Sequence, residues 1–391
     1  MVVRHFLDWF DIAPARERAE AARMMAQCCL SGELGEDIPG DAEAALMLVL
    51  DDPAISVRAA LAWELAQDAR APRQLVIGLA HDVAEVASPV LARSPLLGEA
   101  DLVDCVGHGD PLTHLAIAMR QSVSERVALA LAERADARAL CGLLDNGGAS
   151  IPEAAFRLML ARHGGDGALR EALNRRDDLP ADVRQSLVSA VSDDLLALVS
   201  RRGWIAGHRA ERAIVDAREA ATIALARDAA DLGRFVAHLA ETDQLTPALL
   251  LRSLLCGDTT LFGAALVTLS GVSGGRVAGM LGARTGAALA AACVKAGLPR
   301  TMVPAFTAAL AAIRQIKDAP AADGVDLQRP IIAHVLAACL HEDVDALRPV
   351  IAMLRRFDAE AARAQARADI GRFRTTPLDH AGAAAIPALP D

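Results

Sequence analysis

Two histidines and an aspartate stand close together in the first third of the chain, where they could share a metal ion. His108, Asp110 and His114 fall within seven residues, and an Asp and a His four positions apart lie on one face of a helix. However, Asp110 directly precedes Pro111, and an Asp-Pro pair is typical of a helix start, where the carboxylate caps the first turn. Capping explains the pattern, so we expect no metal ion here.

Two His-acid doublets raise a related chemistry, because some helical-repeat iron hydroxylases hold their metal with such pairs. His81 precedes Asp82, and His341 precedes Glu342. Several doublets would have to converge on one metal ion, and the neighbouring segments offer none in register. We interpret both doublets as solvated helix ends and expect no cofactor.

A glycine-rich stretch, GVSGGRVAG at 271–279, opens a helical pattern, where backbone N–H groups could bind an anion. Phosphate loops of the familiar kinds follow a strand and carry G-x-G-x-x-G or a terminal Lys-Ser/Thr, and this stretch does neither. We expect Gly271 to end one helix and Ser273 to cap the next. No Cys or Ser stands in a recognisable nucleophile setting. The sequence therefore predicts no catalytic residue and a protein that is not an enzyme.

A patch of arginines around one tryptophan is the best candidate for a binding site. It lies at 200–212 and comprises Arg201, Arg202, Trp204, His208, Arg209 and Arg212. Arginines beside a tryptophan could clamp a phosphate, a carboxylate or an acidic partner peptide. The alternative is an ordinary solvated junction with Trp204 buried between two lobes, which is the commoner arrangement.

Internal repeats indicate which elements would carry these residues. Segments that begin at Ser124, Pro152 and Pro180 start 28 residues apart. Each contains a helix pattern, a short break and a second helix pattern, so each is predicted to be a helical hairpin. Apolar residues align in two columns, four positions apart, in the first helix of each segment. The columns are Val127, Ala155 and Val183, and Leu131, Met159 and Leu187.

An earlier set of segments has the same period. Ser56 and Ala84 are 28 residues apart, a third start lies near Leu112, and an offset of 12 residues leads on to Ser124. The offset most simply means one extra or shortened helix. Because a single hairpin leaves its apolar face in water, only stacking removes that face from solvent. We therefore expect Met159 to be buried between neighbouring hairpins.

After about residue 201 the period fades, and the run 204–240 predicts one long helix, with Arg227 and Asp231 as a pair one turn apart. An apolar stripe follows one side of this run: Ala210, Ala213, Ile214, Ala217, Ala221 and Ala224. Small residues let another helix approach closely. We expect the stripe to pack within a monomer, and a homodimer contact is the alternative.

The composition favours helices. Of 391 residues, 53% are hydrophobic and 3% aromatic, with no tyrosine, and the abundant Ala and Leu lose little on entering a helix. The formal net charge is −10. The chain thus lacks the basic footprint of proteins that bind nucleic acid, and we expect no nucleic acid partner.

Cysteines and apolar runs indicate the compartment. The seven cysteines form no C-x-x-C pair, which is typical of reduced thiols that fill a core. The first residues build no signal-peptide core, and the apolar runs, such as 44–50, are far shorter than the roughly 20 residues that span a bilayer. We expect a cytoplasmic protein with no membrane partner.

Four stretches in combination resemble a bacterial family known as domain of unknown function 2336. They are VASPVLARSPLLGEADLV, RRDDLPADVRQSLVSAVSDDL, LTPALLLRSLLCGD and KAGLP, spread over roughly residues 50 to 300. The resemblance implies helical repeats of the HEAT/armadillo type. It implies no activity, because the family has none assigned.

These observations predict an all-α protein, a HEAT-like α-solenoid of stacked hairpins followed by an irregular all-helical lobe. The expected ranges are a helical lead-in at 1–40, the array at 41–203, the lobe at 204–360, and a helix end with a disordered tail at 361–391. Stacked hairpins offer a long concave surface, so we expect a non-enzymatic scaffold or adaptor for a protein or peptide partner. The alternative is a nucleic-acid or nucleotide binder, including a base-modifying enzyme.

Overall fold

The computed structural model is all-α over the residues that it describes, which are 9–10, 12–31, 39–202, 207–283, 286–318, 327–341 and 344–375. Within these ranges there is no strand, and one isolated bridge joins Val123 to Ala149. The predicted all-α class is confirmed. The chain forms two compact units, Met1–Ala190 and Val191–Asp391.

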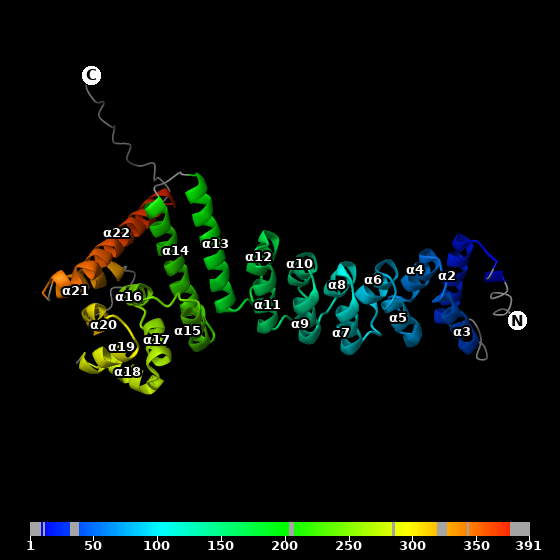
Figure 1. The fold of residues 1–391 in the computed structure, drawn as a ribbon, viewed down its shortest axis with the longest axis horizontal. Coiled ribbons are helices and arrows are strands. Elements are labelled where there is room, and N and C mark those ends of the chain that lie inside the picture. Colours follow the sequence, from blue (N-terminus) through cyan, green and yellow to red (C-terminus); the bar gives the residue numbers. More distant parts are fainter. Residues whose placement is uncertain are drawn as a thin grey trace, which may run out of the picture. The chain divides into compact units, whose positions relative to one another are not determined.

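The first unit is a series of short helices. They are α2 (Ala15–Ser31), α3 (Pro39–Val49), α4 (Ile55–Leu65), α5 (Arg73–Ala80), α6 (Ala84–Arg93), α7 (Glu99–His108), α8 (Pro111–Ala118), α9 (Glu125–Arg134), α10 (Ala137–Asp145), α11 (Glu153–His163) and α12 (Gly167–Asn174), followed by the start of α13 (Ala181–Arg202). The even-numbered helices α2 to α12 contact one another in series, and α7, α9 and α11 form a second series. Consecutive helices therefore alternate between two layers (Figure 1).

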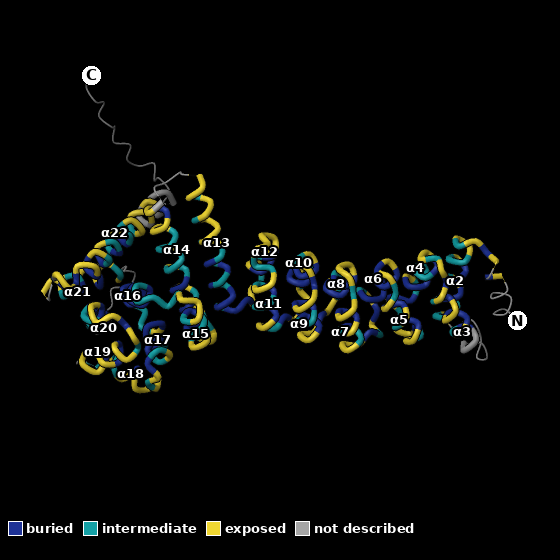
Figure 2. The backbone as a smooth tube through the Cα atoms, viewed as in Figure 1, coloured by how far each residue is buried: buried dark blue, intermediate teal, exposed yellow. Residues whose placement is uncertain are grey.

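The apolar columns lie between these layers. Val127, Ala155 and Val183 are buried, and so are Leu131, Met159 and Leu187. Met159 has no exposed surface, so the predicted burial of Met159 is confirmed. Figure 2 shows the same pattern along the unit, where buried and exposed stretches alternate within each helix.

The 12-residue offset moves the repeat from one layer to the other. The earlier segments open with α4, α6 and α8, which belong to the even series, whereas the later ones open with α9, α11 and α13. A helix and its turn take about half of the 28-residue period, so an offset of 12 residues adds one helix. The alternation of layers continues through this added helix. The earlier and the later segments thus begin in opposite layers.

Ion pairs tie successive helices of this unit together. Arg18 of α2 donates from Nε and Nη2 to the Asp52 carboxylate at 2.7 and 2.9 Å. Arg58 of α4 donates in the same way to Asp82, at 2.5 and 2.8 Å. Burial alone would raise the pKa of Asp52, but hydrogen bonds from Arg18 and the Ala54 amide lower it below its ordinary value. These forked pairs fix the spacing of the first hairpins.

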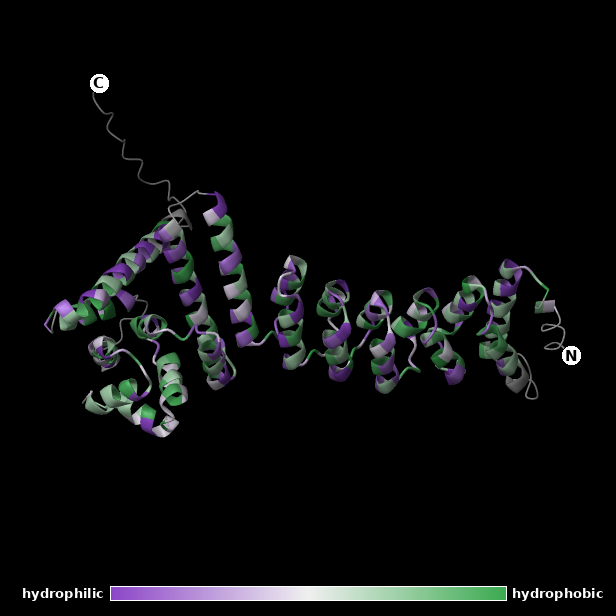
Figure 3. Ribbon diagram, viewed as in Figure 1, coloured by the Kyte–Doolittle hydropathy of each residue, from purple (hydrophilic) through white to green (hydrophobic). Residues whose placement is uncertain are grey.

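The second unit contains longer and less regular helices. They are the end of α13, α14 (Gly207–Asp228), α15 (Leu232–Glu241), α16 (Pro247–Leu255), α17 (Thr260–Ser270), α18 (Gly274–Gly282), α19 (Ala287–Lys295), the 3₁₀ turn η1 (Arg300–Met302), α20 (Val303–Asp318), α21 (Gln328–Leu340) and α22 (Val344–Thr375). In Figure 3 polar and apolar residues alternate along α14 and α22, as amphipathic helices require.

The prediction of one long helix over 204–240 is wrong. The run is divided into α14 and α15, because the Asp231 carboxylate accepts a hydrogen bond from the Arg234 amide at 2.9 Å and caps a new helix. Arg227 does not pair with Asp231; it lies 3.4 Å from the Asp258 carboxylate, beyond α16.

The expected internal alanine stripe is wrong for half of its residues. Ala213, Ala217 and Ala224 are exposed, Ile214 and Ala221 are half-buried, and Ala210 is buried. Thr222 and Ile223, outside the stripe, are buried instead. The helix is turned so that two acidic side chains of α14 point inward, where they pair with a buried arginine.

That arginine, Arg252 of α16, organises the centre of the second unit. Its side chain is 4% exposed and lies 2.7 Å from Asp216, 2.9 Å from Glu219 and 2.8 Å from Glu360 of α22. The guanidinium also stacks 4.4 Å from the ring centroid of Phe357. Three helices distant in sequence are therefore joined at one cation.

The expected ends of the chain lie only partly within the described residues. The predicted lead-in contains α2 and the beginning of α3, and the predicted final segment contains the end of α22 up to Thr375. Residues 376–391, where a disordered tail is expected, lie outside the described residues. In the described part of the chain, no helix combines the length and the apolar character needed to cross a bilayer.

Candidate functional site

A groove follows α6 on the solvent-facing side of the even-numbered layer. Its cavity volume is about 500 Å³, within the range of ligand-binding pockets. Three consecutive members of the layer, α4, α6 and α8, supply the residues that line it. They are Trp63, Glu85, Ser88, Pro89, Ala92, Arg93, Leu112, Leu115, Ala116 and Met119.

Large apolar side chains form the two walls. Trp63 of α4 is 54% exposed, and on the opposite side Leu112 is 48% and Met119 66% exposed. Leu112, Leu115 and Met119 recur at helical spacing along α8 and its C-cap, so they present one apolar ridge. Exposed apolar patches of this kind mark interaction sites more often than isolated exposed residues do.

Small side chains of α6 form the floor. Ser88 turns its hydroxyl back to the Ala84 carbonyl at 2.6 Å, and Ala92 adds only a methyl group. Pro89 lies within the helix and lacks an N–H, so it cannot donate to the carbonyl of Glu85. The side chains of the floor are therefore short, and the carbonyl of Glu85 lacks its usual helical donor.

A glycine on α10, the next helix of the even-numbered layer, leaves room for the apolar ridge of α8. A Cβ at Gly142 of α10 would stand 3.0 Å from Cδ1 of Leu115 and 4.0 Å from Cγ of Met119. Any larger residue there would push the wall of the groove. The ridge of α8 is therefore positioned by close packing on α10.

Opposite charges stand at the two ends of the groove. Glu85 lies in the first turn of α6 and Arg93 in the last, two turns or about 12 Å apart along the axis. Both positions also suit the helix macrodipole. The Arg93 guanidinium lies 4.6 Å from the centroid of the Trp63 ring, so it supports one wall as well as closing one end.

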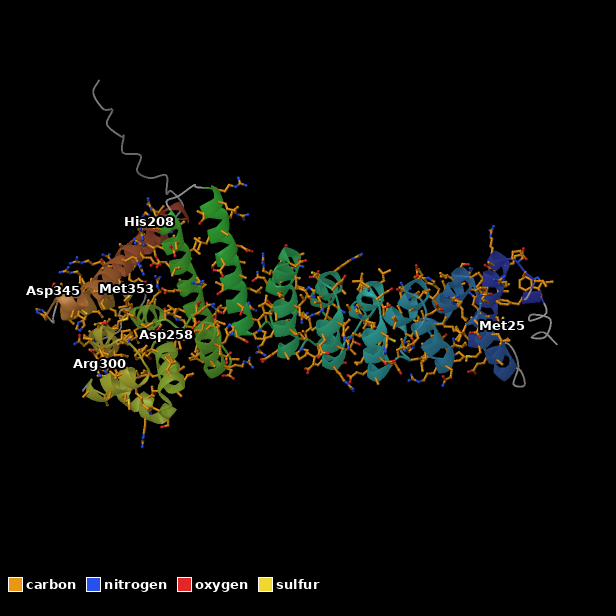
Figure 4. All side chains as sticks on the ribbon, in the orientation of Figure 1. Met25, His208, Asp258, Arg300, Asp345 and Met353 are labelled. Carbon is orange, nitrogen blue, oxygen red and sulfur yellow. The ribbon has the colours of Figure 1, made fainter. Side chains whose placement is uncertain are left out.

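The arginine patch predicted from the sequence lies on two successive helices of the second unit. Arg201 and Arg202 end α13, and His208, Arg209 and Arg212 lie in the first two turns of α14. All five side chains are exposed, and Figure 4 marks His208 at its end of α14. Trp204 lies outside the described residues, so both interpretations of the patch stay predictions.

The histidines of the suspected metal motif have other partners. The Asp110 carboxylate accepts a hydrogen bond from the Thr113 amide at 2.9 Å, which confirms its role as an N-cap. Nε2 of the buried His114 lies 3.0 Å from the Val106 carbonyl, and Nδ1 of His108 lies 3.2 Å from the Asp104 carbonyl. Among the described residues, no group of three His, Cys, Asp or Glu side chains could hold a metal ion.

One doublet, His81-Asp82, lies beside a cysteine in an arrangement that resembles a nucleophile with its base. Nε2 of His81 is 4.0 Å from Sγ of Cys105 and 3.1 Å from Oδ2 of Asp104. However, Cys105 is 3% exposed, and burial raises the pKa of its thiol to about 11. A buried thiol is a poor nucleophile because only the thiolate reacts. The second doublet falls partly outside the described residues, at Glu342.

The glycine-rich stretch behaves as a helix boundary. Gly271 ends α17 in the left-handed conformation, with φ of 66°, and Ser273 is the N-cap of α18. The helix end at Gly271 is confirmed, and Ser273 occupies the predicted N-cap position, although its side chain makes no capping hydrogen bond. Glycine suits such a C-cap because it has no Cβ to clash.

A second cavity, of about 560 Å³, opens between α19, α20 and α21. Small residues dominate its lining, and its two basic side chains are Arg314 and His334. The Arg314 guanidinium donates to the carbonyls of Leu281 and Ala283, at 3.1 and 2.8 Å. Arg314 therefore serves as a structural cap, and the cavity offers few polar groups to a ligand.

Sequence reasoning missed the groove. The buried residues of α4 and α8 recur at helical spacing. Trp63 and Leu112 are large apolar residues that lie outside this buried face. Large apolar residues at positions off the buried face were a usable signal. Which of them gather, however, depends on the stacking of α4, α6 and α8.

The comparisons with known proteins identify a family but no activity. No curated protein and no solved structure matches the chain. Residues 86–344 match the model of a family described as an uncharacterised protein conserved in bacteria, DUF2336. This match covers more than half of the chain, including α8 and all but the first two residues of α6, and the chain belongs to the DUF2336 family.

Proposed function

We propose that this protein is a non-enzymatic scaffold of the HEAT-like α-solenoid type, which binds a segment of a partner protein. The 28-residue period and the two alternating series of helices support the solenoid. The exposed apolar groove of Trp63, Leu112 and Met119 supports the binding function and is the observation that carries it. Partner binding would remove these side chains from water.

The charges of the groove favour a protein over a nucleic acid. Binding of nucleic acid takes rows of Lys and Arg along a phosphate backbone, whereas one acidic and one basic residue line this groove. Large apolar and aromatic anchors are typical of protein interfaces. Nucleic-acid binding would therefore have to use another surface of the chain.

The arginine patch provides a second candidate contact. Arg201, Arg202 and Arg209 are all exposed. Arg201 and Arg202 suit the C-terminal end of α13, whereas Arg209 at the start of α14 opposes the helix macrodipole, so helix stability does not explain Arg209. An acidic segment of a partner protein would suit these arginines. We place the protein in the cytoplasm, because its seven cysteines form no disulfide bond.

Site-specific photo-cross-linking tests this function. A photoreactive phenylalanine analogue replaces Met119 in the full chain, expressed in the native host, and the cross-linked peptides are mapped by mass spectrometry. The control carries the same analogue at Glu133, an exposed position of α9. We expect one partner segment to cross-link at 119 but not at 133, and the cross-link to disappear with Leu112→Asp.

Leu112 is half exposed, so its substitution leaves the fold intact, which an unchanged melting temperature checks. Equal cross-linking at both positions, or cross-linking that survives Leu112→Asp, would show that the groove is not the binding surface.

A further inference from the structure

We infer that the occupant of the groove is an amphipathic α-helix of the partner, with a basic side chain at the Glu85 end and an acidic one at the Arg93 end. This inference rests on the proposed function and specifies its ligand. The groove residues themselves distinguish among the known modes of peptide recognition.

Three common modes do not fit the groove. Strand addition needs an exposed sheet edge, and the described residues contain no strand. Proline-rich peptides bind between several aromatic rings, whereas Trp63 is the aromatic residue of this lining. Phosphorylated motifs bind clusters of arginines, and this lining has Arg93 alone. Among the modes that depend on large apolar side chains, insertion of a helix into an apolar groove is the one that fits this lining.

The dimensions of the groove suit a helix. Its floor follows α6, a helix of 10 residues, or about 15 Å and almost three turns. Small floor residues such as Ser88 and Ala92 allow a second helix to approach to the usual 8–10 Å between axes. Trp63 on one wall and Leu112 and Met119 on the other would then contact apolar residues at i, i+3, i+4 and i+7 of the ligand.

The charges at the two ends set the polarity of the ligand. Glu85 and Arg93 lie two turns apart along the floor, and residues seven or eight positions apart on a ligand helix span the same distance. Charges at the rim of an interface govern specificity more than affinity. A ligand with one cation and one carboxylate at that spacing matches both ends.

A charge-swap experiment on the full chain tests this inference. The probes are fluorescent peptides of roughly 16 residues, long enough to be helical on an alanine-rich scaffold, with leucines at i, i+3, i+4 and i+7. They differ in two end residues, two turns apart, which are Lys and Glu, Lys and Lys, Glu and Glu, or Gln and Gln. Binding is measured by fluorescence anisotropy. This design does not depend on the direction in which a peptide lies.

We expect the natural chain to prefer the Lys and Glu peptide by about five-fold, the effect of an exposed ion pair. Glu85→Lys should shift the preference to the Glu and Glu peptide, and Arg93→Glu to the Lys and Lys peptide. Arg93→Gln, which loses the stacking on Trp63 without reversing the charge, is the matched control. A proline in the centre of the best peptide should reduce binding about ten-fold or more, because it breaks the helix.

Three results would overturn the inference: no peptide binds, the charge swaps leave the preference unchanged, or the proline peptide binds equally well. A groove that is filled by a second copy of the chain, seen as a dimer that Leu112→Asp dissociates, would also overturn it. The photo-cross-link at position 119 is independent of these probes. If a groove-dependent cross-link to a partner persists while the inference fails, the proposed function stands.

Discussion

The guanidinium of Arg93, in the last turn of α6, lies 4.6 Å from the centroid of the indole ring of Trp63 on α4. The two residues belong to successive helices of the same layer, which contact each other. Their stacking restrains the orientation of the exposed indole ring at the edge of the groove. Without this contact the ring would be free to rotate. The same contact links the architecture of the repeat to its candidate binding surface.

This pair should show a measurable coupling energy. In a double-mutant cycle of Trp63→Leu and Arg93→Met, we expect about 0.5–1 kcal/mol, the usual strength of an exposed cation–π contact. Urea unfolding of the four proteins gives the value. A coupling energy of zero would mean that stacking does not position the tryptophan.

Substitution of the buried column should destabilise the first unit severely. Met159→Asp places an unpaired carboxylate in a site with no exposed surface, which costs several kcal/mol against a total stability of about 5–15. Leu112→Asp, at a half-exposed site, should cost about 0.5 kcal/mol or less. Thermal melting followed by circular dichroism distinguishes the two, and similar melting temperatures would contradict the register of the repeat.

Two glycines provide a test of the close contact behind the groove. In a helix, Gly→Ala gains about 0.5–1 kcal/mol when there is room for the methyl group. Gly107 of α7 has no atom within 4 Å of an added Cβ, whereas at Gly142 the Cβ would meet Leu115 at 3.0 Å. We therefore expect Gly107→Ala to stabilise the chain and Gly142→Ala to gain less or to destabilise it. Equal gains in chemical denaturation would show that the ridge of α8 moves freely.

The Arg252 cluster should make stability depend on mildly acidic pH. Burial raises the pKa of Glu219 above its ordinary value of 4.5, so the folded state binds this proton more tightly than the unfolded state does. The contribution to stability is present below about pH 4.5 and is lost as the pH rises through the raised folded-state pKa. Glu219→Gln should remove this dependence, and melting temperatures of both proteins between pH 4 and 7 measure it. Parallel curves would contradict the prediction.

His81 should contribute a separate dependence near neutral pH. Hydrogen bonds to the Ile77 carbonyl and to the Asp104 carboxylate raise its pKa above 6.5. Its stabilising effect is therefore complete below pH 6.5 and fades as the pH rises through the folded-state value. The difference in melting temperature between the natural chain and His81→Gln should shrink over that range. In an Asp104→Asn background, the effect of His81→Gln on the melting temperature should be smaller at all pH values. An effect that grows with pH would contradict the prediction that His81 stabilises the fold when protonated.

The sequence predicted the all-α class and the capping residues because these depend on short-range interactions. Asp110 and Gly271 act within one turn of themselves, through a side-chain oxygen or a left-handed backbone. The burial of Met159 was also predictable, since the 28-residue period aligns it with Leu131 and Leu187. In a repeat protein the local pattern also predicts packing, because each hairpin contacts a similar neighbour through the same positions.

The tertiary structure alone decided which side of α14 is buried and where the groove lies. Periodicity placed the whole alanine stripe inward, but Arg252 pairs with Asp216 and Glu219, and half of the stripe faces solvent. The cost of leaving a buried cation unpaired exceeds the gain from burying alanine methyl groups. Likewise, Trp63 and Met119 are 56 positions apart in the chain, and only the stacking of three helices brings them to one groove. Interactions between distant residues leave no local pattern, so the sequence by itself could not reveal them.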